Sequence, residues 1–207
     1  MRMDAGERQI ATHLSQVRAD HTARYEWAAK QIAPCTLMDI GAGIGYGTAI
    51  LKGHGFKVLS IEIDQEAIEW GGNYFGAEYE RRDLSSPDCF YALGRFGAAI
   101  CFECIEHLKD PTVMLSRIPA NILFGSVPNE AVFPWQHSFI YHHRHYHAHE
   151  VVDTLHESGW EVSEMMGQRD DVSPVDPNVD GRTIVFRAVR RSPKKPSRAP
   201  AGQIVRV

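Results

Sequence analysis

Hydrophobic residues recur along the chain with two different spacings. Short apolar runs, such as 37–40 and 122–127, are typical of buried strands. Between such runs, apolar residues recur every three or four positions, as Ile10, Leu14 and Val17 do, which is typical of a helix. Strands that alternate with helices predict an α/β fold with a doubly wound, mostly parallel sheet.

The predicted helices cover residues 4–33, 48–52, 65–74, 111–118 and 147–158. The predicted strands cover residues 37–40, 57–62, 77–81, 96–102, 122–127, 160–166 and 182–189. Pro34 ends the first helix, because proline lacks the amide hydrogen that a continuing helix needs. The run 96–102 is apolar on both faces, which indicates that helices cover both sides of the sheet.

The length of 207 residues suits one domain, which we place at residues 1–191. Residues 192–207 are rich in Pro, Lys and Arg and predict a flexible basic tail. No apolar run approaches the ~20 residues that span a bilayer, and the N-terminus lacks a signal-peptide pattern. Four scattered cysteines do not form a disulfide framework, so we expect a reduced, cytoplasmic setting.

The net charge of −4 is unevenly distributed along the chain. Every acidic residue lies at or before Asp180, whereas eight Lys or Arg residues follow it. The body therefore carries −12 and the remainder +8. An acidic body disfavours a broad nucleic-acid groove, although the tail could give a polyanion a local foothold.

The most informative stretch is Leu-Met-Asp-Ile-Gly-Ala-Gly-Ile-Gly-Tyr-Gly-Thr, at positions 37–48. Gly41, Gly43 and Gly45 let the backbone turn sharply after a strand and let a ligand approach closely. Dinucleotide-binding folds use a similar loop, so an NAD(P)-dependent oxidoreductase is one alternative. Asp39 disfavours it, because a carboxylate before the first glycine would repel a pyrophosphate but not a cationic amino-acid group.

Two further acidic residues follow predicted strands. Glu62 ends the second strand, where a carboxylate can accept hydrogen bonds from both ribose hydroxyls. Asp64 is its nearby competitor but falls beyond the strand end. Asp83 closes the third strand and could accept from an adenine amine while Leu84 packs on the ring; the alternative for Asp83 is a turn or cap residue.

The stretch Glu-Cys-Ile-Glu-His-Leu, at 103–108, follows the fourth strand. If this loop coils into a helical turn, Glu103, Glu106 and His107 would lie close together. Such a cluster can bind a divalent metal or supply a general base. The alternative is a polar loop with a capping role.

Histidines are concentrated between His137 and His156, where seven of the eleven lie. Most are expected to be polar loop residues. His145 is the exception, because it immediately precedes a predicted helix and could supply a further ligand or a base. In the first helix, Arg24 could reach over the glycine loop and pair with a carboxylate of the cofactor; a surface position is the alternative.

Six segments together resemble the class I S-adenosylmethionine (SAM) dependent methyltransferases, in particular the group that contains ubiquinone-type O-methyltransferases. They are L-M-D-I-G-A-G-I-G-Y-G, V-L-S-I-E-I-D-Q-E-A-I, R-R-D-L, F-E-C-I-E-H-L-K-D-P, S-V-P-N and R-H-Y-H-A-H-E. The resemblance implies a Rossmann-like sheet of seven strands, ending in an antiparallel hairpin.

The resemblance also implies a cofactor site. The glycine loop would hold the methionine part of SAM, Glu62 the ribose, and Asp83 with Leu84 the adenine. The full set of implied cofactor residues is Arg24, Asp39, Gly41, Ala42, Gly43, Gly45, Glu62, Ile63, Asp83, Leu84 and Glu103.

The pattern of Glu103, Glu106 and His107 resembles that of ubiquinone O-methyltransferases and of RNA-terminal 2′-O-methyltransferases, where these positions can bind a divalent ion. His145 would complete such a metal site. Without a metal, His107 or His145 would take the proton of the acceptor and Glu106 would orient the histidine.

The sequence therefore predicts a SAM-dependent enzyme that methylates a hydroxyl of a small molecule or a sugar. Two alternatives remain open: an enzyme similar to the RNA-terminal 2′-O-methyltransferases, and a non-catalytic SAM-binding subunit.

Overall fold

The computed structural model describes residues 8–178 and 180–192. Its helices are α1 (Ala19–Gln31), α2 (Tyr46–Gly53), α3 (Gln65–Phe75), α4 (Pro111–Arg117) and α5 (Ala148–Glu157), with 3₁₀ turns η1 (Leu14–Gln16) and η2 (Ile105–His107). Its strands are β1 (Thr36–Ile40), β2 (Lys57–Glu62), β3 (Tyr79–Arg81), β4 (Ala98–Phe102), β5 (Ile122–Pro128), β6 (Trp160–Gln168) and β7 (Thr183–Arg190). These elements alternate along the chain much as the hydrophobic spacing predicts.

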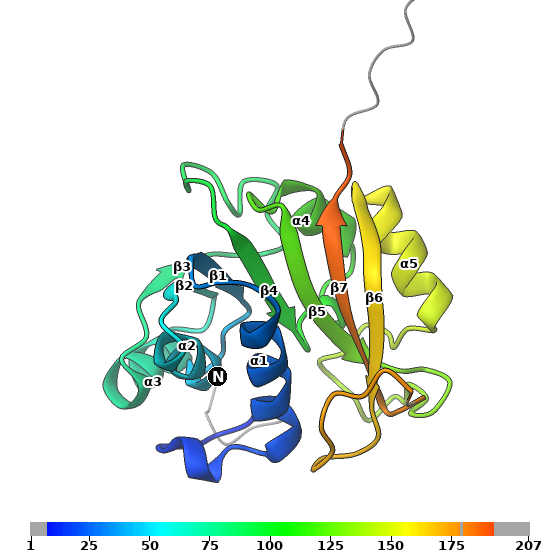
Figure 1. Cartoon of the computed structure of the whole chain (residues 1–207), viewed down its shortest axis with the longest axis horizontal. Helices are drawn as coiled ribbons and strands as arrows, with labels where there is room; N and C mark the ends of the chain where they lie inside the picture. The colour runs from blue at the N-terminus through cyan, green and yellow to red at the C-terminus, as the bar shows by residue number, and fades with distance from the viewer. Residues whose placement is uncertain (1–7, 179, 193–207) are drawn as a thin grey trace, which may run out of the picture.

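The seven strands form one sheet in the order β3-β2-β1-β4-β5-β7-β6 (Figure 1). The first five strands run parallel, and β7 is inserted antiparallel between β5 and β6. The predicted fold class is thus confirmed, including the antiparallel C-terminal hairpin.

The core lies in two layers, one on each side of the sheet. Successive residues of a strand point to opposite faces, so Leu37 packs with residues of α1 and α2, while Met38 packs with residues of α4 and α5. Both side chains are fully buried. Because the strands are parallel, their carboxyl ends meet at one edge, where β1, β2, β4 and β5 lead into loops that carry polar residues.

The first predicted helix is wrong in its N-terminal part. Within residues 8–18 only the short turn η1 forms, and α1 begins at Ala19. Val17 and Arg18 have extended backbones, and the Gln16 side chain accepts hydrogen bonds from the amides of Thr12 and His13. The apolar residues of this segment serve another purpose: Ala11 and Val17 pack against the glycine loop and α3. Tertiary burial therefore overrides the helical spacing here.

Smaller differences concern strand ends. The third strand begins at Tyr79 rather than Ala77, and the fourth at Ala98, with Phe96 making one isolated bridge to Ala120. Only Ser192 of the predicted tail lies inside the described residues. None of the described helices is long and apolar enough to cross a bilayer.

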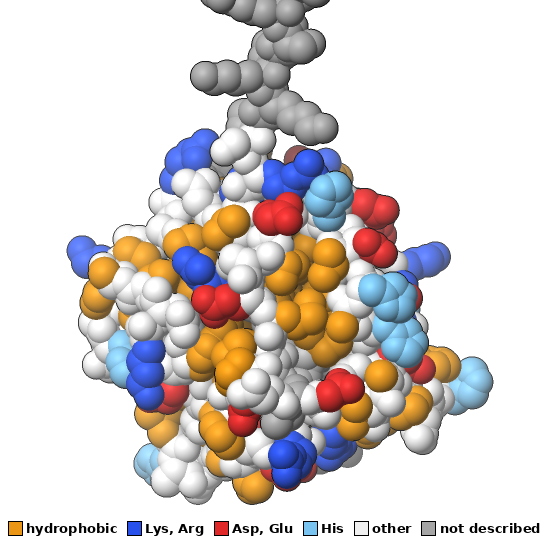
Figure 2. Space-filling model, turned by 45° about the vertical axis from the view of Figure 1, so that its right-hand side comes forward, with side chains coloured by type: hydrophobic (Ala, Val, Ile, Leu, Met, Phe, Trp, Pro, Cys, Tyr) orange, Lys and Arg blue, Asp and Glu red, His pale blue; other side chains and the backbone are white. Residues whose placement is uncertain are grey.

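Figure 2 turns the side that carries β6 and α5 in Figure 1 toward the viewer. On this face hydrophobic side chains are interspersed with acidic and basic ones, and neither sign of charge forms a continuous field (Figure 2). Such a mixed surface is ordinary for a globular protein and lacks the basic stripe of a nucleic-acid groove.

Candidate active site

The glycine loop turns sharply between β1 and α2. Gly41, Gly43 and Gly45 all have positive φ angles, of 69°, 54° and 81°, which favour glycine. The amides of Gly41 and Ala42 both donate to the carbonyl oxygen of Ile61 in β2, at 2.9 and 3.0 Å. The loop is therefore pinned against the neighbouring strand.

The space beside Gly43 is open. Nothing lies within 4 Å of the position that a Cβ of Gly43 would occupy, whereas a Cβ on Gly41 would lie 2.6 Å from Sγ of Cys104. Gly41 is thus required for packing, while Gly43 leaves room that a ligand can use.

Asp39 is completely buried beneath the loop. Tyr25 donates to its Oδ1 at 3.1 Å and Thr48 to its Oδ2 at 3.0 Å. Burial raises the pKa of Asp39 to about 7, although both hydroxyl hydrogen bonds oppose the shift. The carboxyl group of Asp39 therefore gains or loses its proton near neutral pH. A cationic ligand bound at the glycine loop would stabilise the ionised form of this carboxyl group.

Glu62 ends β2 with its carboxylate fixed by backbone amides. Its Oε2 accepts from Gly43 at 2.9 Å, and its Oε1 accepts from Ile63 and Asp64 at 2.8 and 3.0 Å. These amides occupy three of the about four lone pairs of an ionised carboxylate, so Oε2 keeps acceptor capacity for a further donor. Beside it, Ile63 is 50% exposed, so an apolar side chain adjoins the carboxylate at the edge of the open space.

Asp64 has a different task from Glu62. Its Oδ1 accepts from the amide of Glu66 and so caps α3, and its Oδ2 lies 2.6 Å from Nη1 of Arg8. Nη2 of Arg8 also approaches Glu62, at 3.9 Å. The N-terminal segment therefore crosses the open end of β2, which the helical pattern did not predict.

Asp83 and Leu84 follow β3. Asp83 accepts from the amide and hydroxyl of Ser85 through Oδ1, and these bonds lower the pKa of Asp83. Asp83 therefore stabilises a turn, which was the alternative to its contact with adenine. Its Oδ2 makes none of the described hydrogen bonds. Leu84 is partly buried against the core.

Arg24 projects from α1 into the protein and is 2% exposed. Its Nη1 donates to Gln168 at 2.7 Å and to Asp20 at 3.4 Å, whereas its Nε is buried without a hydrogen-bond partner. The guanidinium is thus held by α1 and the end of β6, and it is close enough to Glu106 to oppose the rise in the pKa of that carboxyl.

Glu103 and Glu106 have different surroundings, although they are only three residues apart. Glu103 adopts a positive φ of 48° just after β4, and its Oε1 accepts from the Ser126 hydroxyl at 2.7 Å. Glu106 lies in η2 and is fully buried, and neither of its carboxylate oxygens has a hydrogen-bond partner. Burial, with Glu103 nearby, holds the pKa of Glu106 well above its usual range.

One group of three potential metal ligands occurs among residues 8–178 and 180–192. It consists of Glu106, His107 and His142, whose ligand atoms lie within 4.8 Å of one another. The predicted set is therefore only partly assembled: Glu106 and His107 meet, and His142 joins them in place of Glu103 and His145. Burial and the nearby His107 and His145 lower the pKa of His142 to about 3, so its ring is neutral.

The histidine segment supplies backbone contacts to this group. Nδ1 of His107 lies 3.0 Å from the carbonyl oxygen of Tyr141, and the amide of His143 donates to the carbonyl of Glu106 at 2.8 Å. His145 sits behind His142, with its Nε2 2.8 Å from Nδ1 of His142.

Several site residues had escaped the sequence reasoning. They are Arg8, Tyr25, Thr48, Tyr79, Ser126 and His142. For Tyr25 a signal exists in the sequence: its spacing of three and four residues from Ala28 and Ala29 is typical of the buried face of a helix. The contacts of the other five residues join different segments of the chain, so no local sequence pattern predicts them.

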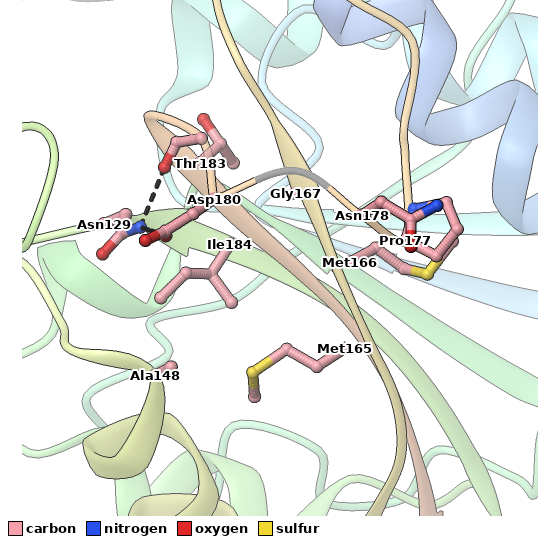
Figure 3. A pocket seen from close by; sticks show the side chains of 11 residues that line it. Asn129, Ala148, Met165, Met166, Gly167, Pro177, Asn178, Asp180, Thr183 and Ile184 are labelled. Atoms are coloured by element: carbon pink, nitrogen blue, oxygen red, sulfur yellow. Dashed lines mark hydrogen bonds between the residues drawn. The ribbon is translucent and has the colours of Figure 1, made fainter.

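A separate cavity of about 300 Å³ lies at the C-terminal ends of β5 and β6 (Figure 3). Met165 and Ile184 line it together with polar residues, and Asn129 donates from Nδ2 to Asp180 at 3.0 Å across its rim. None of the predicted cofactor residues lines this cavity. This cavity is therefore distinct from the predicted cofactor site at the glycine loop.

Comparisons with known proteins agree with this geometry. Residues 13–165 match the family model described as a methyltransferase domain. A probable S-adenosylmethionine-dependent methyltransferase from Mycolicibacterium smegmatis is 24% identical over 163 residues, which cover 71% of this chain and 60% of that relative. The chain thus matches less than two thirds of the relative's length.

Solved structures share the fold. A Thermotoga maritima SAM-dependent methyltransferase, described as a possible histamine N-methyltransferase, superimposes with a TM-score of 0.68 at 16% identity, covering 84% of this chain and 90% of that one. The glycopeptide N-methyltransferase MtfA in complex with SAM gives a TM-score of 0.65 at 14% identity, covering 84% and 88%.

The residues at the glycine loop fit SAM. Gly43 leaves open space, Glu62 offers fixed acceptors for hydroxyl groups, and the buried carboxyl of Asp39 suits a cationic ligand rather than a pyrophosphate. The family match covers most of the chain and includes these residues. The chain belongs to the methyltransferase-domain family.

Proposed function

We propose that this enzyme transfers the methyl group of SAM to a hydroxyl oxygen of a small molecule or a sugar. One observation carries the proposal: Glu106 is a fully buried carboxyl whose two oxygens have no hydrogen-bond partner, and it lies beside two histidines. A hydroxyl acceptor must lose its proton, whereas a neutral amine can attack directly. Glu106, His107 and His142 therefore offer the base, or the ligands of a metal, that a hydroxyl acceptor needs to lose its proton.

In this proposal SAM lies along the carboxyl ends of β1 to β3. The glycine loop and Asp39 hold the methionine part, Glu62 accepts from the ribose hydroxyls, and Asp83 accepts from the adenine amine. Arg24 pairs with the carboxylate of the cofactor. Support for the Arg24 role comes from its burial and from its Nε, which has no partner in the described protein.

The acceptor would lie against η2, with its hydroxyl near His107 and Glu106. Methyl transfer is an in-line displacement on a sulfonium, so the protein mainly aligns the acceptor oxygen with the methyl carbon and excludes water. His107 would take the acceptor proton on Nε2, because its Nδ1 faces the Tyr141 carbonyl and must carry the hydrogen of that bond.

A divalent metal is compatible with the same residues. Glu106, His107 and His142 would hold it, with one oxygen and two nitrogen donors, a mixture that suits Mn²⁺, Co²⁺ or Zn²⁺ better than Mg²⁺. A buried carboxylate without hydrogen-bond donors is a group that a cation would satisfy. Such a metal would lower the pKa of a bound hydroxyl.

The test uses matched acceptors that differ only in the accepting atom. The protein is incubated with methyl-labelled SAM and with pairs of phenols and anilines, or sugars and amino sugars, and products are identified by mass spectrometry. We expect labelled ethers and loss of their formation in Glu106→Gln, with SAM affinity retained. Transfer only to nitrogen, unchanged in Glu106→Gln, would overturn the proposal. SAM binding without any turnover would indicate a non-catalytic subunit.

A further inference from the structure

Gln168 joins three segments of the chain at the end of β6. The residue is 1% exposed, its Oε1 accepts from Nη1 of Arg24 at 2.7 Å, and its Nε2 donates to the carbonyl oxygens of Asp20 and Ser173, each at 3.0 Å. We propose that Gln168 is a positioning residue, which orients the guanidinium of Arg24 for the carboxylate of SAM. The inference rests on the cofactor contact of Arg24 in the proposed function.

The orientation of the Gln168 amide follows from its partners. A guanidinium can only donate, so the atom that meets Arg24 must be the oxygen Oε1. Backbone carbonyl oxygens can only accept, so the NH₂ group must face Asp20 and Ser173. Turning the amide over would set donor against donor and acceptor against acceptor. The side chain therefore has one arrangement, and Arg24 meets a fixed acceptor.

Asp20 holds the same guanidinium more loosely than Gln168 does. Its Oδ2 lies 3.4 Å from Nη1 of Arg24. Arg18 instead meets both carboxylate oxygens of Asp20, at 3.0 Å from Nε to Oδ1 and 2.7 Å from Nη2 to Oδ2. The short hydrogen bond of Arg24 is thus the one to a neutral amide. An amide fixes the direction of a guanidinium without neutralising its charge, which leaves that charge for an anionic ligand.

The other donors of Arg24 have no partner among the described residues. Both hydrogen bonds of its side chain use Nη1, whereas Nε is buried without a partner and Nη2 makes none of the described hydrogen bonds. A buried guanidinium with unmet donors is costly until an acceptor satisfies them. A carboxylate is the acceptor that matches a guanidinium best, because the two groups can form two parallel N–H···O bonds.

The face of α1 that carries Arg24 lies against the glycine loop. Nδ1 of His21 is 2.7 Å from the hydroxyl of Tyr46, the first residue of α2, and Tyr25 donates to Asp39 beneath the loop. Arg24 directly precedes Tyr25 and lies one helical turn after His21. Burial raises the pKa of Tyr46, and the Arg24 guanidinium opposes this rise, so its charge acts at the start of α2. Arg24 is therefore on the cofactor side of α1.

The alternative is that Gln168 only ties the segment after β6 to α1. That segment has other ties at the surface: Arg18 pairs with Asp171 at 3.1 Å, and the amide of Asp20 donates to the carbonyl of Asp171 at 3.2 Å. A surface ion pair contributes little to stability. Asp171→Ala removes the ion pair and leaves the acceptor of Arg24 in place, so this variant is the matched control that separates the two roles.

The test compares SAM with decarboxylated SAM, which keeps the adenosine, the sulfonium and the amine and lacks only the carboxylate. Calorimetry gives the ratio of the two affinities without turnover. We expect SAM binding to weaken about 10–100-fold in Arg24→Met and about 5–10-fold in Gln168→Met, as for a charge-assisted hydrogen bond that is lost or misdirected. Decarboxylated SAM should bind both variants as it binds the wild-type protein. Asp171→Ala should keep both affinities.

The double variant shows whether Gln168 acts through Arg24. In the Arg24→Met background we expect Gln168→Met to lower the affinity ratio no further, because the group that Gln168 orients is gone. A further loss in the double variant would overturn the inference. So would an affinity ratio in Gln168→Met equal to that of the wild-type protein, since damage to the fold alone weakens both ligands alike.

The result for Arg24→Met separates this inference from the proposed function. If Arg24→Met lowers the affinity ratio and Gln168→Met does not, Gln168 has no positioning role and the proposed cofactor contact of Arg24 stands. If Arg24→Met leaves the ratio unchanged, that contact is wrong and the inference falls with it. Methyl transfer to nitrogen would contradict the proposed acceptor and would change neither ratio.

A milder variant covers the case in which Gln168→Met does not fold. Gln168→Asn keeps a buried amide but shortens it by one methylene, so it cannot reach Arg24, Asp20 and Ser173 at once. We expect the same selective loss of SAM binding, and an affinity ratio equal to that of the wild-type protein would overturn the inference.

Discussion

The backbone amide of Gly43 donates to Oε2 of Glu62 at 2.9 Å, so the glycine loop after β1 and the carboxylate at the end of β2 form one unit. We predict that Glu62→Ala weakens SAM binding by about 2–3 kcal/mol, because charge-assisted hydrogen bonding to the ribose is lost together with the bond that holds Gly43. Titration calorimetry with SAM measures the change.

Asp64→Ala is the matched control for Glu62→Ala. Asp64 caps α3 and pairs with Arg8, so its loss should lower the free energy of unfolding by about 1 kcal/mol while leaving SAM affinity nearly unchanged. A larger loss of SAM affinity in Asp64→Ala than in Glu62→Ala would show that the ribose carboxylate has been misassigned.

Gly43→Val should abolish SAM binding and leave the protein folded. The new side chain would enter the open space beside the loop, at the backbone cost of a positive φ of 54°. Gly76→Val is the control, because Gly76 also has open space and a φ of 60° but lies at the end of α3. Both variants should lose similar thermal stability and only the first should lose SAM; wild-type affinity in Gly43→Val would contradict the assigned cofactor site.

The buried Asp39 should make the stability of the ligand-free protein depend on pH. Its pKa is raised from 3.8 to about 7, so between these values the folded protein binds more of its proton than the unfolded chain does. The free energy of unfolding therefore falls as pH rises through this window, by up to about 4 kcal/mol at 1.36 kcal/mol per pH unit.

The measurement compares Asp39→Asn with the wild-type protein by denaturant unfolding at pH 5 and pH 8. Asparagine is uncharged at both, so the stability of the variant relative to wild type should be higher at pH 8 than at pH 5. An identical difference at the two pH values would show that the carboxyl of Asp39 is not desolvated as the structure indicates.

Chelation separates the two versions of the proton transfer. If a metal is used, EDTA should abolish methyl transfer, Mn²⁺ or Co²⁺ should restore it, and His142→Gln should be as severe as Glu106→Gln. If His107 acts alone, EDTA should have no effect and His107→Gln should be the most severe substitution. Rates of labelled product formation distinguish them, and full activity in EDTA after removal of bound ions would exclude the metal version.

Deletion of residues 193–207 should leave the melting temperature and SAM affinity nearly unchanged, because this segment has little apolar surface to bury. The cut preserves Arg190, which lies over the ring of Trp160, and Arg191, whose amide donates to Gly159. A large drop in melting temperature would mean that the tail docks on the domain. Weaker acceptor binding with steep salt dependence would instead favour a polyanionic acceptor such as RNA.

Local patterns predicted much of the cofactor side of the molecule. The predicted ranges match all seven strands to within two residues at each end, and the central parallel strands leave a continuous hydrophobic signal because both of their faces are buried. The glycine spacing predicted the turn after β1, since positive φ angles at alternate positions favour glycine. The N-terminal segment was mistaken for helix, because its apolar residues have helical spacing but pack against the glycine loop and α3.

The sequence by itself thus determined the sheet, the glycine loop and the strand-end position of Glu62, all of which depend on residues close together in the chain. Only the tertiary structure decided which side chains surround Glu106. Spacing favoured Glu103 and His145, yet the structure brings His142 into the group, ties Glu103 to Ser126 and places His145 one hydrogen bond behind. The reason is physical: the segment 129–147 docks through backbone hydrogen bonds and stacked rings, and these long-range contacts decide which histidine reaches a carboxyl that lies more than thirty residues earlier in the chain.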